Sequence, residues 1–204
     1  MSNKPARPPE PSFSDIEPGS KVQAPASAGM RGIIDALLQG SLVDLFQAYG
    51  VAIAPLPRNG RAEPERYPEL SALISFNAAR DGKCASASGR LSLALPSEVM
   101  DAMQNGRPLQ ARHADWTREL VNQLMGRFKN RLLPYGVKLQ AGLPTSIGRE
   151  ALEAEMTRAT GRRVYRGRTL RGEIVATLDG SLNEAELSYT GPTTAPNEGD
   201  LILF

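Results

Sequence analysis

The chain has 204 residues, of which 41% are hydrophobic and 23% charged, and its formal net charge is +2. A chain of this length can bury one sizeable core, and so small a positive excess excludes the dense basic surface of a dedicated nucleic-acid binder. The single cysteine, Cys84, and the single histidine, His113, exclude internal disulfides and leave too few ligands for a Cys/His zinc site.

Several other classes of protein lack their sequence signals. No run of about 18 apolar residues occurs, and no charged N-terminal stretch precedes an apolar segment, so we expect a cytoplasmic protein that does not span a membrane. The glycine-rich motifs that bind nucleotides are absent from the sequence. A Ser/His/Asp triad would have to use His113, and no Gly-x-Ser-x-Gly motif accompanies it.

Residues 1–29 differ in composition from the rest of the chain. They are rich in proline and polar side chains and contain little to bury, which is typical of a disordered leader. Phe13 and Ile16 could form a short docking motif within it, although a solvated tail is the simpler interpretation. We expect a single domain over residues 30–204.

The first half of this domain is predicted to contain two helices and three strands. Leu91, Leu93 and Leu95 alternate with smaller or polar residues, as in a half-buried antiparallel strand. The predicted elements are, in chain order, a helix at 31–49, strands at 51–55, 72–78 and 91–95, and a helix at 96–103.

The second half begins with the longest predicted helix. It includes residues 115–130 and runs to Leu133, where Pro134 and Gly136 end it. The other elements predicted in this half are all strands, at 137–143, 163–168, 173–178, 184–189 and 201–204.

The two halves share a sequence repeat. Leu38-Gln-Gly40 and Tyr49-Gly-Val51 recur 86 residues later as Leu124-Met-Gly126 and Tyr135-Gly-Val137. After a three-residue gap, the stretch from Gly89 to Leu95 matches the stretch from Gly172 to Leu178. The repeat predicts an α/β (α+β) fold with pseudo-two-fold symmetry, in which long helices pack on one side of a mainly antiparallel sheet. The internal halves are about 31–104 and 113–190.

The long helix of the second half carries the strongest candidate site. At about 100° per residue, its large apolar side chains fall on one arc, and a polar face opposes them. The polar face comprises Glu119, Asn122, Gln123, Gly126 and Asn130. Glu119 and Asn122 are spaced i, i+3, so their side chains can engage one partner together, and Gly126 leaves that approach open.

On its own, Glu-x-x-Asn is a common spacing, and a solvated helix face is the simplest explanation of it. The repeat adds an argument, because it aligns Ile33 with Glu119 and Ala36 with Asn122. The first half therefore has the same scaffold without the polar pair, and only the second half could hold the site.

Over about residues 31–190, the layout resembles CheX-type members of the CheC/CheX/flagellar-switch superfamily, phosphatases that act on phosphorylated chemotaxis response regulators. The resemblance is sharpest over residues 115–144. It is carried by Asp115, Glu119, Asn122, Gly126 and Leu143-Pro144. The sequence departs from the family pattern at Arg127, Phe128 and Arg131, where smaller residues are usual, and Arg127 could crowd the docking surface or bind an acidic partner.

The resemblance implies that Asn122 orients the water that attacks an aspartyl phosphate, and that Glu119 pairs with a lysine of the regulator. It implies that Mg²⁺ is bound by the regulator, with no cofactor or metal ligands in this chain, and that two copies pair through their sheets. The residues expected to dock the phosphorylated response regulator are Gln123, Gly126, Arg127 and Asn130.

Two other interpretations stay open at this point. The same fold could serve as a non-catalytic adaptor or scaffold that binds a response regulator or another signalling component. Alternatively, a group of arginines could bind nucleic acid, although exposed arginines on strands more often protect a sheet edge. These are Arg162, Arg163, Arg166, Arg168 and Arg171.

Overall fold

The computed structural model describes residues 32–56, 67–80, 83–103, 113–158, 161–182, 184 and 187–191, which all belong to the second of two units, Arg31–Phe204. Two of the predictions, the leader at 1–29 and the strand at 201–204, lie outside the described residues.

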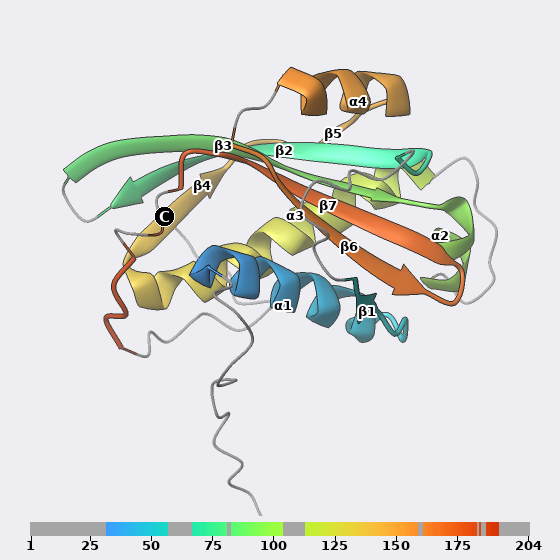
Figure 1. Cartoon of the computed structure of the whole chain (residues 1–204), viewed down its shortest axis with the longest axis horizontal. Coiled ribbons are helices and arrows are strands. Elements are labelled where there is room, and N and C mark those ends of the chain that lie inside the picture. The colour runs from blue at the N-terminus through green and yellow to red at the C-terminus, as the bar shows by residue number, and fades with distance from the viewer. Residues whose placement is uncertain are drawn as a thin grey trace, which may run out of the picture. The chain divides into compact units, whose positions relative to one another are not determined.

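Helices and strands succeed one another along the described segments as the repeat predicts, with additions in the second half (Figure 1). The first half contains α1 (Ile33–Ala48), β1 (Ala54–Pro55), β2 (Leu70–Arg80), β3 (Lys83–Leu95) and α2 (Ser97–Met103). The second contains α3 (His113–Leu132), the 3-10 helix η2 (Leu133–Tyr135), β4 (Val137–Ala141), β5 (Thr145–Ser146), α4 (Arg149–Arg158), β6 (Arg163–Thr169) and β7 (Gly172–Gly180).

Two sequence predictions in the second half were wrong. Helix α4 lies where only strands were expected, because its buried apolar residues, Leu152 and Met156, form a single i, i+4 pair that gives no clear helical period. The strand predicted at 184–189 is not formed at the described positions. Glu184 has a 3-10 helical conformation, and the Leu187 N–H donates to the Glu184 carbonyl rather than to a neighbouring strand.

The strands form one antiparallel sheet whose order reflects the repeat. The order is β1-β6-β7-β3-β2-β4, with β5 also paired to β2. Exchanging β1 with β4, β2 with β6 and β3 with β7 gives the same order read from the opposite edge. At the centre, Leu93 of β3 pairs with Ala176 of β7, and these residues are the ones that the sequence repeat aligned. The predicted pseudo-two-fold symmetry is therefore present in the strand order and in the register.

The first helix of each half ends in the same way. Gly50 follows α1 with φ of 73°, and Gly136 follows η2 with φ of 70°, a left-handed conformation that glycine adopts without steric cost. Their N–H groups donate to the carbonyls of Gln47 and Leu133, both at 2.9 Å. The repeated Tyr-Gly-Val sequence thus makes the same chain reversal twice.

Helices α1 and α3 cover one face of the sheet, and α4 lies on the other (Figure 1). The main core fills the space between α1, α3 and the strands, and its largest fully buried side chains include Phe46, Phe76 and Phe128. A smaller cluster beneath α4 includes Leu152, Met156 and Val175. The long helices pack on one side as predicted, so the outward face of α3 is available for function.

Candidate functional site

Helix α3 divides cleanly into a buried and an exposed face. Its buried apolar residues recur at helical spacing and pack into the main core, whereas the Glu119 and Asn122 side chains are exposed. The buried apolar residues are Leu120, Val121, Leu124, Met125, Phe128 and Leu132. Core packing therefore fixes the rotation of the helix and turns the Glu119/Asn122 pair outward.

Two hydrogen bonds connect Glu119 to helix α1. The Gln123 Nε2 group donates to Glu119 Oε1 at 2.9 Å, and the Tyr49 hydroxyl donates to Gln123 Oε1 at 3.0 Å. The Tyr49 ring meets the Trp116 ring edge-on, with centroids 6.0 Å apart and planes at 78°. Within the described residues, no hydrogen bond engages the Asn122 amide, which leaves its donor and acceptor groups available to a water or a partner.

The other residues expected to dock a partner lie on the same helix. Gln123, Gly126, Arg127 and Asn130 are all partly exposed. Arg131 instead pairs with Asp44 of α1, and Phe128 is part of the core. Two of the three departures from the family pattern thus have structural roles away from the exposed face.

The two helical glycines of the repeat have different surroundings. A Cβ atom on Gly40 would lie 2.7 Å from Nη1 of Arg131, so this glycine makes room for the Arg131–Asp44 pair. A Cβ atom on Gly126 would meet nothing within 4 Å. Glycine inside a helix costs about 1 kcal/mol relative to alanine. Packing does not explain this cost at Gly126, which leaves a gap on the exposed face.

Gly126→Ala is therefore expected to stabilise the fold by about 0.5–1 kcal/mol, since alanine restricts the unfolded chain and meets no neighbour here. Urea unfolding measures the change. Gly40→Ala is the matched control, and its gain should be smaller or negative because Arg131 must move. A loss of stability in Gly126→Ala would show that this glycine has a packing role after all.

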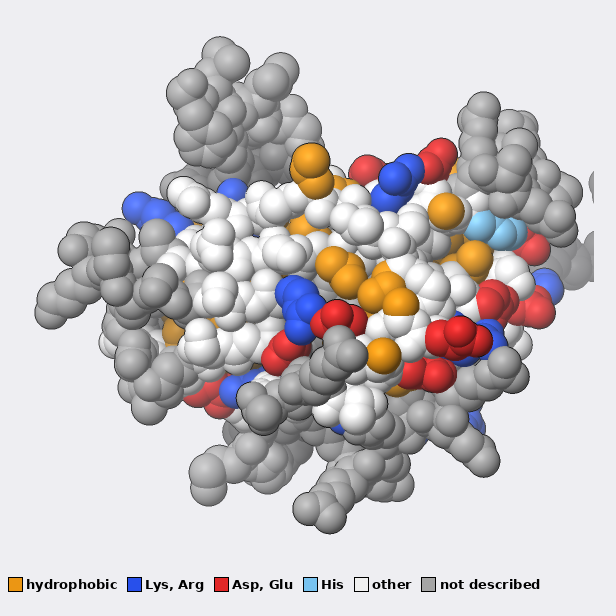
Figure 2. Space-filling model, turned by 90° about the horizontal axis from the view of Figure 1, so that it is seen from above, with side chains coloured by type: hydrophobic (Ala, Val, Ile, Leu, Met, Phe, Trp, Pro, Cys, Tyr) orange, Lys and Arg blue, Asp and Glu red, His pale blue; other side chains and the backbone are white. Residues whose placement is uncertain are grey.

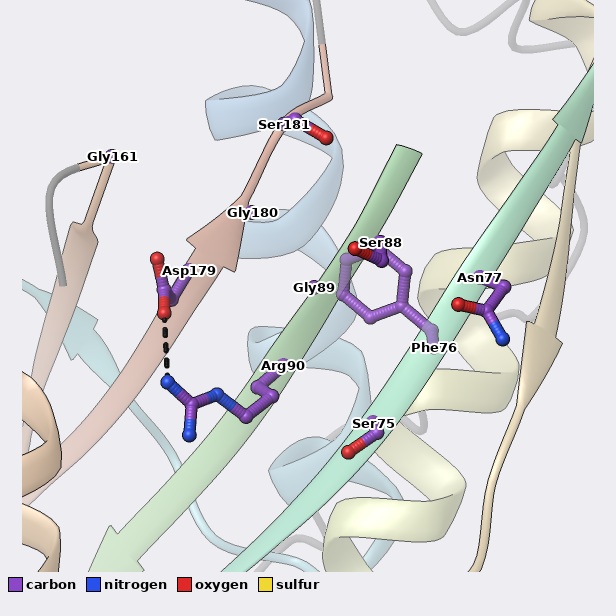
Figure 3. Close-up of a pocket in the computed structure, with 10 residues that line it drawn as sticks. All are labelled: Ser75, Phe76, Asn77, Ser88, Gly89, Arg90, Gly161, Asp179, Gly180 and Ser181. Carbon is purple, nitrogen blue, oxygen red and sulfur yellow. Dashed lines mark hydrogen bonds and ion pairs between the residues drawn. The ribbon is translucent and has the colours of Figure 1, made fainter. Parts of the chain in front are cut away.

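A second candidate lies on the opposite face of the sheet. A polar hollow of about 660 Å³ opens there over β2, β3 and β7, and Figure 3 shows α1 and α3 behind the strands that line it. Its side chains include Ser75, Asn77, Ser88 and Arg90. Figure 2 shows this face of the molecule. Hydrophobic and charged side chains gather from the centre to the right of the view, and the left part of the described surface carries few charged side chains.

This hollow was not predicted from the sequence, although Ser75 and Asn77 alternate with Ile74 and Phe76 at strand spacing. The one cation among the residues that line it, Arg90, is paired with Asp179 at 3.2 Å and with Glu155 of α4. The Glu155 hydrogen bond does most to raise the pKa of Arg90, against the effect of its burial. As far as the described residues show, the hollow therefore offers hydroxyl and amide groups but no uncompensated charge, and the exposed face of α3 is the stronger candidate site.

Comparison with solved structures identifies the fold. A CheC-like superfamily protein from Shewanella sp. PV-4 is 16% identical, with 74% of this chain and 99% of that one aligned and a TM-score of 0.58. Chemotaxis protein CheX from Vibrio vulnificus is 14% identical over 76% and 100% of the two chains, with a TM-score of 0.55. This chain has the CheX fold.

A third structure is a CheX–CheY–BeF₃–Mg²⁺ complex from Borrelia burgdorferi, at 12% identity over 73% and 96% of the chains, with a TM-score of 0.51. No family model matches this chain, and neither does any curated protein. At these identities, the likeness to CheX is one of fold.

Two of the five arginines considered for nucleic-acid binding form ion pairs within this CheX fold. Arg163 pairs with Asp35 at 3.0 Å and with Glu184, and Arg166 pairs with Glu173. The hydrogen bonds that Arg166 donates to Glu173 raise the pKa of Arg166 despite its partial burial. These arginines are neutralised by their neighbours, which argues against a phosphate-binding patch.

The remaining observations concern His113, metals and membranes. The His113 side chain is buried, and its Nε2 lies 3.1 Å from Asp101 Oδ1. In the described segments, no group of three or more His, Cys, Asp or Glu side chains is arranged to hold a metal ion. None of the described helices is long and apolar enough to cross a bilayer.

Proposed function

We propose that this chain is a phosphatase that hydrolyses the aspartyl phosphate of a response-regulator receiver domain. The observation that carries the proposal is the Glu119/Asn122 pair, which lies exposed on the outward face of α3 in a CheX fold. The solved complex of a CheX with CheY supports a receiver domain as the partner. A receiver partner also agrees with the cytoplasmic location expected from the sequence.

Hydrolysis of an aspartyl phosphate requires little covalent chemistry from the phosphatase. A water oxygen attacks the phosphorus in line, the bond from phosphorus to the aspartate oxygen breaks, and the aspartate leaves as a carboxylate while the phosphate retains the water's oxygen. Asn122 would accept a hydrogen bond from this water and hold it in line, without changing its own protonation. The Mg²⁺ ion would be bound by the acidic pocket of the receiver.

Glu119 would anchor the partner through a charge-assisted hydrogen bond to a lysine beside the phosphorylated aspartate. Among the described residues, Gln123 donates a hydrogen bond to Oε1 of the Glu119 carboxylate. The other oxygen, Oε2, is left for the lysine. The gap at Gly126, one turn after Asn122, would let the receiver approach closely. Gln123, Arg127 and Asn130 would border the contact.

The test is the decay of aspartyl phosphate on the receiver domains of the source organism, with and without this chain. Faster decay on at least one receiver, lost in Asn122→Ala, would establish the activity. Binding of a receiver with unchanged decay would make the chain an adaptor. Pairing of two copies through their sheets is a separate prediction, which sedimentation equilibrium would test.

Glu119→Ala is expected to weaken binding to the phosphorylated receiver by about 10- to 100-fold, because a charge-assisted contact is lost. The rate at saturating concentration should fall much less than in Asn122→Ala, and titrating the chain against a labelled receiver separates the two effects. Glu150→Ala, an exposed carboxylate on α4, is the control and should change neither. Unchanged affinity in Glu119→Ala would exclude its role as an anchor.

A further inference from the structure

The Glu119 carboxylate is restrained by a side chain whose own orientation is fixed. A glutamine amide can present either its oxygen or its NH₂ group, and only the NH₂ group can donate to a carboxylate. The Tyr49 hydroxyl donates to Gln123 Oε1, so the NH₂ group is left facing Glu119, at 2.9 Å. This orientation makes the contact with Glu119 attractive.

The tyrosine is itself held in place by helix α1. It follows the last residue of α1, and its backbone N–H donates to the Phe46 carbonyl at 3.0 Å. Its ring packs edge-on against Trp116, one turn before Glu119. The backbone hydrogen bond and the ring packing therefore set the position of the Tyr49 hydroxyl. The exposed face of α3, which this hydroxyl reaches, does not determine that position.

The chemistry of Gln123 suits a carboxylate that must bind a cation. Lysine or arginine at this position would neutralise Glu119 and compete with an incoming cation, whereas a glutamine amide donates a hydrogen bond and carries no charge. Restraining the glutamate in advance also reduces the side-chain entropy lost on binding. Gln123 thus orients the carboxylate and leaves its charge available.

The repeat provides an internal comparison. Tyr49 corresponds to Tyr135 and Gln123 corresponds to Leu37, so the first half has no amide at this place. The Tyr135 ring packs edge-on against Tyr189 at 5.7 Å, and within the described residues no hydrogen bond engages its hydroxyl. As far as the described residues show, the hydroxyl of the repeated tyrosine is used beside Glu119 and not in the other half.

We propose that Tyr49 and Gln123 are positioning residues, which hold the Glu119 carboxylate ready for a cationic group of the partner. This inference rests on the proposed function and extends it from the exposed face of α3 to the end of α1. Neither residue touches the reacting atoms, so both act on the binding of the receiver rather than on the hydrolysis step.

The test measures the affinity for a receiver domain treated with beryllofluoride, in which BeF₃⁻ stands in for the phosphoryl group. Tyr49→Phe keeps the ring and removes the hydroxyl, and Gln123→Met keeps the length and removes the amide. Each should weaken binding by about 3- to 10-fold, and Tyr49→Phe should leave the rate of phosphate loss at saturation within about 2-fold of wild type. Tyr135→Phe is the matched control and should bind like wild type.

A second set of variants separates positioning from a general structural role. In a Glu119→Ala background, Tyr49→Phe should not weaken binding further, because the hydroxyl acts through the missing carboxylate. An additional loss in that background would overturn the proposal. Unchanged affinity in both single variants, with wild type accelerating phosphate decay, would overturn it and leave the proposed function standing.

The hydrogen bonds can also be followed without a partner. The side-chain amide resonances of Gln123 in a ¹H–¹⁵N spectrum should move in Tyr49→Phe and in Glu119→Ala, and stay in place in Tyr135→Phe. Resonances that do not move would overturn the proposal whatever the receiver assay shows. If the resonances move but wild type binds no receiver, the proposed function fails and the docking role fails with it.

Discussion

Asn122→Ala is expected to slow the hydrolysis of the receiver's aspartyl phosphate by about 100-fold or more at saturating concentration, because the attacking water loses the group that orients it. The affinity for the beryllofluoride-treated receiver should change little, since Glu119 and the rest of the exposed face remain. Single-turnover decay of labelled phosphate measures the rate. Unfolding in urea should be unchanged within about 0.5 kcal/mol, because the side chain is exposed.

Asn77→Ala is the matched control for this prediction. Asn77 is also an exposed asparagine, but it lies on the opposite face of the sheet, in the polar hollow. Its removal should leave phosphate decay at the wild-type rate. If Asn77→Ala slows hydrolysis and Asn122→Ala does not, the active face has been assigned to the wrong side of the sheet.

Phe128→Ala is expected to lower the free energy of unfolding by about 3–5 kcal/mol. Phe128 is fully buried on the inner face of α3, and truncation would remove its apolar contacts and leave a cavity in the main core. Urea unfolding followed by circular dichroism measures the loss. Activity per folded molecule should stay near wild type, because the exposed face of the helix keeps its residues.

Leu170→Ala is the control for this second prediction. Leu170 is a large apolar residue in the turn between β6 and β7, and its side chain is fully exposed. Its truncation should change the free energy of unfolding by less than about 0.5 kcal/mol. A loss below 1 kcal/mol in Phe128→Ala would mean that α3 is not anchored to the sheet as described.

Local patterns in the sequence were sufficient to predict α3 and its candidate site. Apolar residues such as Leu124 and Phe128 recur with the helical period, so the position of Glu119 and Asn122 on the opposite face follows from rotation alone. The internal repeat then predicted the paired halves, because residues that make the same turn, Gly50 and Gly136, occupy equivalent places.

Features that depend on tertiary contacts were not predictable in the same way. Tyr49 and Gln123 are 74 residues apart, and no local pattern marks them as hydrogen-bond partners. Helix α4 is held on the far face of the sheet through Leu152 and Met156. The stability of this helix comes from packing rather than from a helical period in the sequence. The hydrogen bond from Tyr49 to Gln123, which supports the candidate site, therefore became visible only in the structure.

The order of the strands has a consequence for how the protein is made. Among the described strands, only the hairpins β2–β3 and β6–β7 pair within one half, whereas β1–β6, β3–β7, β2–β4 and β2–β5 each join the two halves. During synthesis, the first half emerges with β1 lacking its neighbour and one side of β3 open, until β6 and β7 leave the ribosome. Such long-range pairing slows folding and exposes strand edges, so the nascent chain should depend on chaperones until β7 is complete.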